Sequence, residues 1–323
     1  MEKRIKETRK FILLETFLLC ISIILLITFI CFKKLNTNNV EKKNLLTQEY
    51  EQRKQVLAEK ENELKLVDKE SENYKDVKTR INETKDEYFK LLSKIEKDIK
   101  ENKTNKKIAY LTFDDGPYYN TYKVLDILDK YNVKATFFTT TINGQYCYDN
   151  KSYNCYKLYK EYIKRGHTIA NHTYTHAIRK GLYESTESFM KAVKDQENHV
   201  KEQTDGYITN ILRFPGGSST ARELKSSIIN ELRKEKYGWV DWNGADGDGG
   251  KLSSEDEAWN YFKNTINEKI EVILYHDYSR YTTNLLPQMI EYLESNNYIL
   301  LPLFYESVMV NKWQSKNTNI LQS

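Results

Sequence analysis

The sequence predicts an α/β domain of parallel strands and helices, preceded by a membrane-spanning helix and a helical coiled-coil stalk. Three observations predict this organisation: residues 11–32 are almost wholly apolar, residues 41–103 carry a seven-residue apolar repeat, and residues 107–305 alternate short apolar runs with amphipathic segments. A polar C-terminal tail, residues 306–323, closes the chain. The net charge of +4 arises from interspersed opposite charges and gives no reason to expect a nucleic-acid partner.

The N-terminal apolar segment is long enough to cross a membrane. Phe17–Phe32 contains no charged residue, and extension back to Phe11 adds only Glu15. At about 1.5 Å per helical residue, this length spans a hydrocarbon core. The alternative is a cleaved signal peptide, but no small-x-small cleavage site follows the apolar run. Basic residues slightly favour residues 1–10 as a cytoplasmic N-terminus, which predicts a single-pass cell-membrane protein with its remaining domains outside the cytoplasm.

The next segment, residues 41–103, has the repeat of a coiled coil. One core position of each heptad is apolar or aromatic from Val67 to Ile95, whereas the other is polar at Ser71, Lys78 and Lys85. This weak middle favours a stalk over a strong oligomerisation zipper, and self-association through it is left open. The alternative is a single solvated helix held by Glu–Lys pairs. A straight helix of this length would reach on the order of 90 Å.

The elements of the globular part follow from its apolar spacing. Short runs rich in apolar, β-branched or aromatic residues predict seven strands, namely Ile108–Phe113, Lys134–Thr139, Thr168–Ala170, Ile211–Phe214, Tyr237–Trp242, Glu271–Tyr275 and Tyr298–Pro302. Helical spacing between them predicts helices over Tyr122–Tyr131, Leu158–Lys164, Ser185–Thr204, Ala221–Lys234, Ser254–Asn267 and Leu285–Ser295.

Local signals support two of these helices. Ser185 begins a Ser-x-x-Ser sequence that can cap the helix after it, and acidic residues in the first turn after Ser254 suit the helix dipole. The regular alternation of strand and helix indicates a parallel sheet, either closed into a barrel or open and doubly wound. The pattern by itself leaves both open.

The unusual polar residues of this domain follow the ends of predicted strands. They are Asp114 and Asp115, His172 and His176, Arg213, Asp241, Asp246 and Asp248, and His276 and Asp277. Because the carboxyl ends of parallel strands meet at one edge, where barrel enzymes carry their active sites, these side chains are expected to form one site.

The residue types point to a metal. Two histidines four positions apart, with a carboxylate from another strand, make a three-ligand set that leaves room for water. The alternative for the pair is two exposed histidines on a helix. A zincin protease fits poorly, because that chemistry needs Glu directly after the first His, where this chain has Thr173. The adjacent Asp114 and Asp115 could simply cap a turn, but strand geometry points neighbours apart, so one can bind metal while the other acts as a base.

Five ordered motifs resemble those of a known family. They are Thr112–Pro117 (TFDDGP), His172–His176 (HTYTH), Arg213–Gly217 (RFPGG), Asp241–Asp248 (DWNGADGD) and Leu274–His276 (LYH). In this order they resemble the motifs of the polysaccharide deacetylases, the NodB-homology enzymes of carbohydrate esterase family 4. The resemblance covers 107–305 and implies a distorted (β/α)7 barrel.

The resemblance also implies roles. Asp114 would be the general base, Asp115, His172 and His176 would bind a divalent metal, and His276 would be the general acid. Zinc suits these ligands best, with cobalt or manganese as alternatives.

The remaining site residues carry the departures from the family pattern. Arg213 would orient Asp114, and a fourth-motif acid would pair with Arg213 or tune His276; Asp248 is the expected acid, with Asp246 close enough to compete. Many members have Tyr after Arg-x-Pro, whereas this chain has Gly216 after Pro215, so only a backbone N–H can donate to an oxyanion. Candidates for stacking on sugar rings are Trp242, Tyr118, Tyr119 and Tyr174, although with 25 tyrosines in the chain the alternative is that they are ordinary surface or packing aromatics.

The resemblance and the anchor together suggest a cell-wall or exopolysaccharide substrate, most of all peptidoglycan N-acetylglucosamine, with release of acetate. Alternatives are exported poly-N-acetylglucosamine, N-acetylmuramic acid, chitin oligomers, O-acetyl xylan, or an inactive glycan-binding envelope scaffold. Cys147 and Cys155, the only cysteines of the globular part, are a candidate disulfide outside the cytoplasm, although coincidence is the alternative.

Overall fold

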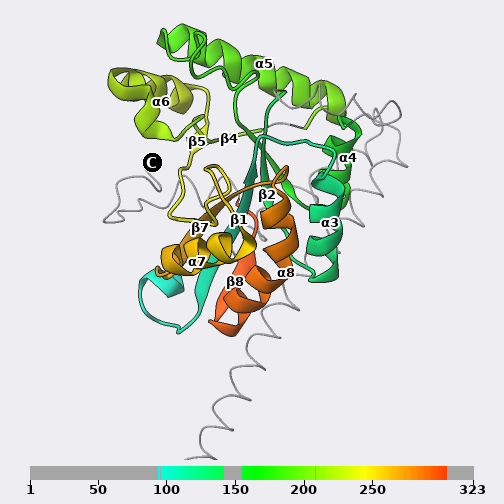
Figure 1. Cartoon of the computed structure of the whole chain (residues 1–323). Coiled ribbons are helices and arrows are strands. Elements are labelled where there is room, and N and C mark those ends of the chain that lie inside the picture. Colours follow the sequence, from blue (N-terminus) through cyan, green and yellow to red (C-terminus); the bar gives the residue numbers. More distant parts are fainter. Residues whose placement is uncertain (1–93, 95, 142–154, 208, 304–323) are drawn as a thin grey trace, which may run out of the picture. The chain divides into compact units, whose positions relative to one another are not determined.

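The computed structural model describes residues 94, 96–141, 155–207 and 209–303, all within a compact unit over Leu91–Ser323 (Figure 1). The predicted anchor, most of the predicted stalk, Cys147 and the polar tail lie outside the described residues. Within the described ranges, no helix is both long and apolar enough to cross a bilayer. The end of the stalk range is helical at 96–100, where Ile99 is buried, and the compact unit therefore begins before the predicted boundary at 107.

Eight parallel strands form one curled sheet flanked by helices (Figure 1). The sheet runs in the order β5-β4-β3-β2-β1-β7-β6, and β8 also pairs with β1. The strands are β1 (Lys107–Asp114), β2 (Thr136–Thr139), β3 (Thr168–Asn171), β4 (Ile211–Leu212), β5 (Gly238–Trp239), β6 (Gly244–Ala245), β7 (Ile270–His276) and β8 (Tyr298–Leu301).

Strand β1 is the centre of the sheet. It pairs with β7 from Ile108 to Asp114, so β7 occupies one of its edges along the whole ladder. The other edge is divided: Lys107–Tyr110 pairs with β8 and Thr112–Asp114 pairs with β2. Strand β8 therefore lies beside the amino-terminal half of β1, and β2 lies beside its carboxyl-terminal half. No pairing joins β5 to β6 among the described strands, so the expected barrel is present as a curled, incompletely closed sheet.

All seven predicted strands are present, and one strand was missed. Strand β6 consists of Gly244 and Ala245, which form no apolar run that a sequence pattern could detect. Strands β4 and β5 have two residues each, shorter than predicted, because the chain turns away from the ladder into the site after them.

The predicted helices are also present: α3 (Thr121–Lys130), α4 (Lys157–Lys164), α5 (Thr186–Thr204), α6 (Lys225–Lys234), α7 (Glu255–Thr265) and α8 (Arg280–Ser295). The Ser185 side chain accepts a hydrogen bond from the Ser188 N–H, which confirms the predicted cap. The predicted helix over Ala221–Lys234 is divided, because a 3₁₀ segment, η2 (Ser218–Leu224), is kinked at Arg222 (φ 48°) before α6 begins.

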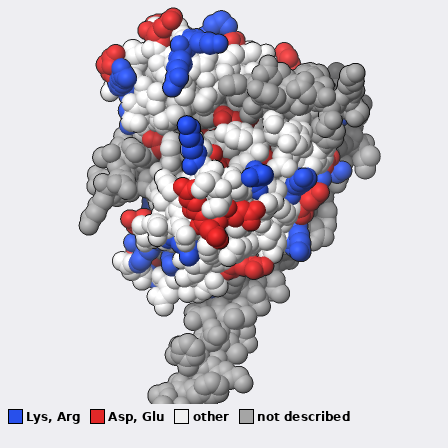
Figure 2. Space-filling model, viewed as in Figure 1, with Lys and Arg blue, Asp and Glu red and all other residues white. Residues whose placement is uncertain are grey.

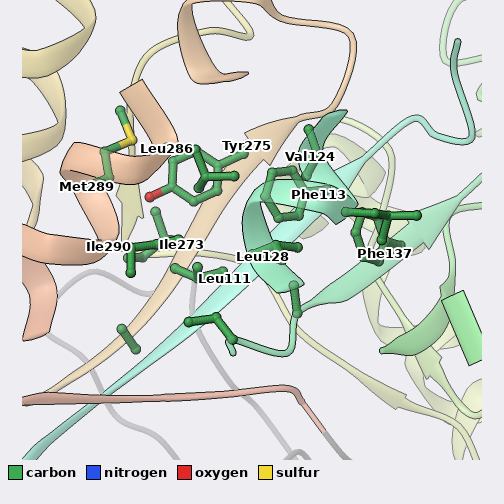
Figure 3. Close-up of a cluster of buried hydrophobic side chains, with 14 of the residues drawn as sticks. Leu111, Phe113, Val124, Leu128, Phe137, Ile273, Tyr275, Leu286, Met289 and Ile290 are labelled. Atoms are coloured by element: carbon green, nitrogen blue, oxygen red, sulfur yellow. The ribbon is translucent and has the colours of Figure 1, made fainter. Parts of the chain in front are cut away.

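Alternation along β1 separates the core from the site. Its residues Leu111 and Phe113 belong to an apolar cluster with Phe137 of β2, Ile273 and Tyr275 of β7, Val124 and Leu128 of α3, and Leu286, Met289 and Ile290 of α8 (Figure 3). Thr112 and Asp114 contact Arg213 instead. Because successive side chains of a strand point to opposite faces, the packing of Leu111 and Phe113 under the helices turns Asp114 towards the interior of the sheet.

The surface carries both signs of charge. Figure 2 shows basic and acidic side chains interspersed over the viewed face, with a group of acidic side chains near its middle. On this face the distribution agrees with the small net charge.

Candidate active site

Polar residues from several of the strand ends meet in one cavity of about 630 Å³, whereas Arg213, Asp241, Asp246 and Asp277 do not line it. Its lining includes Asp114, Asp115, His172, His176, Gly216, Trp242, Asp248 and His276. These residues come from the carboxyl ends of strands or the loops that follow them, the position at which barrel enzymes place their active sites. Two of the predicted site residues, Arg213 and Pro215, do not line the cavity; the Pro215 carbonyl accepts a hydrogen bond from the Tyr183 hydroxyl (2.8 Å).

Asp115, His172 and His176 form a group that could hold a metal ion. One ligand atom from each lies within 4.8 Å of the others, and Asp115 Oδ1 is 3.6 Å from both His172 Nε2 and His176 Nε2. His172 Nδ1 is 2.8 Å from the Arg213 carbonyl oxygen. Because a carbonyl can only accept, Nδ1 carries the hydrogen and the Nε2 lone pair faces Asp115. Burial lowers the pKa of His172, which keeps the ring neutral as a metal ligand requires.

The two histidines lie on a loop and not on a helix. Asp115 (φ 70°), Thr173 (φ 64°) and His176 (φ 50°) all adopt the left-handed backbone conformation. For residues other than Gly, this conformation costs about 1–3 kcal/mol and persists only where the surroundings impose it. Asn171 supplies part of that constraint, since its side-chain oxygen accepts from the Thr173 N–H (2.9 Å) and its amide donates to the Val193 carbonyl (2.9 Å).

A fully buried arginine lies behind Asp114. Arg213 NH1 donates to Asp114 Oδ1 (2.8 Å) and to Thr112 Oγ1 (2.8 Å). Its other nitrogens donate to the Val240 and Asp241 carbonyls (3.3 and 3.1 Å). The guanidinium thus bridges β1 to the chain after β5 and offsets the charge of a carboxylate that is only 3% exposed. The fourth-motif partner of Arg213 is therefore a backbone carbonyl and not an acidic side chain.

His276 and Asp248 form the second pair in the cavity. His276 Nδ1 is 2.7 Å from Asp248 Oδ1, and the His276 backbone N–H donates to Asp248 Oδ2 (2.7 Å). His276 Nε2 faces Asp115 Oδ2 at 3.8 Å. Burial opposes charge on the ring, but the hydrogen bond and charge of Asp248, with smaller contributions from the nearby aspartates, raise the pKa of His276 to about 10. Of the two competing aspartates, Asp248 is the one that contacts His276.

Asp246 lies behind this pair. The Thr282 hydroxyl oxygen is 2.6 Å from Asp246 Oδ2 and 2.6 Å from Asp248 Oδ2, and Thr282 and Asp246 are fully buried. A hydroxyl has one hydrogen, so only one of these contacts can be a donation from Thr282. Burial, and then the charge of Asp248, raise the pKa of Asp246 to about 8. Asp246 is therefore protonated at neutral pH and donates to Thr282, which donates to Asp248.

The sequence did not identify Thr282, because the apolar spacing placed the start of its helix at Leu285. The Ser279-x-x-Thr282 sequence was the available signal, since Ser279 caps α8 by accepting from the Thr282 N–H. The neighbouring Asp277, also at the predicted strand end, points away from the cavity; its carboxylate accepts from the Thr121 hydroxyl.

The loop after β4 is fixed by Asp241, whose carboxylate accepts from the Ser218 N–H (2.9 Å) and hydroxyl (2.5 Å). Gly216 lies in this loop with φ 73°, and a side chain there would meet Thr220 Oγ1 at 3.0 Å and Ile178 Cδ1 at 3.2 Å. Trp242 closes the same side of the cavity, with its ring 5.7 Å from the Arg213 guanidinium. Cys155 is buried and disulfide-bonded, while Cys147, its predicted partner, is not among the described residues.

Comparison with known proteins gives consistent results. A sequence model of the family described as polysaccharide deacetylase matches residues 101–233. An uncharacterized 30.6 kDa protein of Geobacillus stearothermophilus is 32% identical over 208 residues, 60% of this chain and 68% of the relative. The putative polysaccharide deacetylase YheN of Bacillus subtilis is 31% identical over 208 residues, 59% of this chain and 65% of the relative. The crystal structure of the catalytic domain of a peptidoglycan N-acetylglucosamine deacetylase from Eubacterium rectale superimposes with a TM-score of 0.56 at 30% identity, covering 68% of this chain and 93% of that domain.

Proposed function

Since the chain belongs to the polysaccharide deacetylase family, whose members are hydrolases, we propose that it removes the N-acetyl group of peptidoglycan N-acetylglucosamine with the help of a divalent metal ion. The observation that carries this proposal is the arrangement of Asp114, His276 and the three candidate ligands around one cavity. The likeness to a peptidoglycan N-acetylglucosamine deacetylase supports the choice of substrate.

The donor set fits a divalent metal ion, zinc in particular. Two neutral imidazoles and one carboxylate are the ligand types of catalytic zinc sites. The hydrogen bond from His172 Nδ1 to a backbone carbonyl directs Nε2 towards the ion, as second-shell partners of zinc-bound histidines do. When bound, the ion would lower the pKa of water and polarise the acetyl carbonyl.

Two side chains move protons in the proposed reaction. Asp114 accepts the proton of the attacking water through Oδ2, because Oδ1 is held by Arg213. His276 donates from Nε2 to the departing nitrogen, since an amide anion is too basic to leave unprotonated. Asp248 holds the hydrogen on Nδ1 and so presents Nε2 to the cavity.

In the proposed reaction the loop after β4 stabilises the oxyanion. Gly216 has no side chain that could donate, so its backbone N–H is the proposed donor to the developing oxyanion, in addition to the metal. Trp242 lines the same side of the cavity and is proposed to contact the sugar that carries the acetyl group.

We place this chemistry at the cell surface. In the proposal residues 11–32 form the anchor, with residues 1–10 in the cytoplasm, and residues 41–103 form a stalk that reaches the wall. Fractionation of cells that express the full chain tests this part: the protein should sediment with membranes, and an external protease should release the catalytic domain from intact spheroplasts. Recovery of the intact chain in the soluble fraction would contradict it.

Acetate release from N-acetylglucosamine oligomers and from purified cell walls tests the activity. Asp114→Asn and His176→Ala should lose almost all activity, whereas Asp205→Asn, an exposed change at the end of α5, should not affect it. Mass spectrometry of muropeptides from cells with and without the gene identifies the substrate, because only deacetylation of peptidoglycan N-acetylglucosamine leaves de-N-acetylated glucosamine residues in the wall. Full activity of Asp114→Asn at normal metal content would reject the proposed base.

A further inference from the structure

Tyrosines account for three of the four most exposed large apolar side chains in the described part of the chain. They are Tyr119 (50% exposed), Tyr261 (48%) and Tyr278 (38%), and the fourth side chain is Ile163. Tyr261 and Tyr278 line the catalytic cavity, and Tyr119 lies outside its lining. An exposed aromatic surface gathered at a cavity indicates a binding surface more often than a scattered exposed residue does.

Ring contacts connect Tyr119 to the catalytic histidine. The His276 and Tyr278 rings lie 5.1 Å apart between centroids, Tyr278 and Tyr118 6.1 Å, and Tyr118 and Tyr119 4.4 Å. Tyr278 follows the end of β7, and Tyr118 and Tyr119 follow the end of β1. These three tyrosines, which we call the tyrosine ridge, therefore run outward from His276, with Tyr278 nearest to the reacting centre and Tyr119 farthest from it.

The ridge is held by polar contacts that do not use its outer ring. The Tyr118 N–H donates to Thr121 Oγ1 (2.9 Å), and the Thr121 hydroxyl donates to the buried Asp277 carboxylate. Asn120, between the ridge and α3, donates to the Asp277 carbonyl (3.1 Å) and to Thr283 Oγ1 (2.7 Å). These hydrogen bonds thus join the loops after β1 and β7, and the Tyr119 ring is half exposed to solvent.

We infer that the tyrosine ridge binds the sugar rings that adjoin the N-acetylglucosamine being deacetylated, an inference that rests on the proposed function. A pyranose ring has a face of C–H groups that packs on the flat, electron-rich face of an aromatic ring. Rings placed at increasing distance from His276 would bind successive sugars of one chain. The ligand class is a polymer of pyranose units at least three sugars long, and not a free monosaccharide.

Kinetics with N-acetylglucosamine oligomers of increasing length test the ridge. In the native enzyme KM should fall as the oligomer lengthens. Tyr119→Ala should raise KM by about three- to tenfold for the longest oligomer, with a smaller rise for shorter ones and little change in kcat. Tyr119→Phe keeps the aromatic face and should retain the native length dependence. Ile163→Ala, a change of an exposed apolar side chain that is not part of the tyrosine ridge, is the matched control.

Two results would overturn the ridge. One is a Tyr119→Ala enzyme with native KM at every length, and the other is a Tyr119→Ala enzyme whose KM rises equally at every length, because a general structural effect would do that.

A binding measurement separates this inference from the proposed function. Calorimetric titration of Asp114→Asn with an N-acetylglucosamine hexamer requires no turnover. Addition of Tyr119→Ala to this variant should weaken binding by the same factor. If the native enzyme releases no acetate but this difference in binding is present, the function fails and the ridge stands. If acetate is released but the two variants bind equally, the ridge fails alone.

Discussion

Asn substitution at the two aspartates beside His276 should have opposite outcomes. Asp248 accepts from His276 Nδ1, from the His276 backbone N–H and from Thr282, each within 2.7 Å. Asp246 hydrogen-bonds to Thr282 and to the Asp248 backbone N–H, and it is protonated. A carboxamide resembles a protonated carboxyl group, so Asp246→Asn can donate to Thr282 through its NH₂ and accept from the Asp248 N–H through its oxygen.

By contrast, no orientation of the carboxamide in Asp248→Asn preserves all the hydrogen bonds of Asp248 in their present direction. If its NH₂ replaces Oδ2, it faces the His276 backbone N–H, and if it replaces Oδ1, it faces the hydrogen on His276 Nδ1. The first arrangement sets a donor against a donor in a buried place, and the second requires His276 Nδ1 to give up its hydrogen and accept from the NH₂, so in both cases the ionised partner of a charged His276 is lost. An unsatisfied buried donor costs about 1–3 kcal/mol, and a hydrogen bond to a charged group contributes about 1.5–3 kcal/mol. The loss of the hydrogen bond to the charged group, which is common to both arrangements, predicts a loss of about 1.5–3 kcal/mol, or roughly 10- to 150-fold in kcat.

Steady-state acetate release at pH 7, with metal content measured for each protein, decides between the two aspartates. We expect Asp246→Asn to stay within about threefold of the native kcat, while Asp248→Asn shows the large loss. Thr282→Ser should behave like Asp246→Asn, because it retains the hydroxyl, and Thr282→Val should lose activity. The reasoning is refuted if Asp246→Asn loses as much activity as Asp248→Asn, since Asp246 would then act as an ionised group.

Three other predictions follow from the described contacts. Arg213→Lys should lower kcat at least tenfold, because one ammonium cannot donate to Asp114, Thr112 and two backbone carbonyls at once. A kcat equal to that of the native enzyme would show that the positive charge alone is sufficient. Glu271 is fully buried, and burial raises its pKa to about 7. The free energy of unfolding of the native protein should therefore fall by about 3 kcal/mol as pH rises from about 4.5 to 7, whereas Glu271→Gln should lack this fall. Urea unfolding of both proteins at pH 5 and pH 8 measures the difference, and an equal pH dependence of the two proteins would contradict the prediction. Dialysis against a chelator should abolish acetate release, zinc should restore it, and His172→Ala should lower zinc content in parallel with activity; activity that persists in metal-free protein would exclude the metal-assisted reaction.

The long elements could be predicted because each of them contains several repeats of its apolar pattern. Strands β1 and β7 and helix α5 each repeat their apolar pattern several times, so their existence and order were predicted from the sequence. A two-residue strand such as β6 has no period, and Gly244 contributes no apolar side chain. The first turn of α8 was missed for a different reason: it is polar because Thr282 and Thr283 hydrogen-bond to the site and to the loop after β1.

The types and strand-end positions of the site residues were visible in the sequence, and the metal trio, Asp114, His276 and Arg213 were named from it. The sequence also listed the right candidates for the fourth acid. It could not choose between them, because Asp246 and Asp248 are two residues apart in an irregular loop and no period relates them to His276.

What the sequence by itself determined, then, is local: the strand and helix order, the ends of the strands and the chemistry of the groups placed there. The tertiary structure decided which of these groups meet. Asp248 and not Asp246 faces His276, Arg213 reaches Asp114 across the sheet interior, and the outward run of tyrosines joins loops separated by most of the domain. These pairings depend on the curl of the sheet and on left-handed turns at Asp115 and His176, which arise from packing and hydrogen bonds between segments distant in the chain.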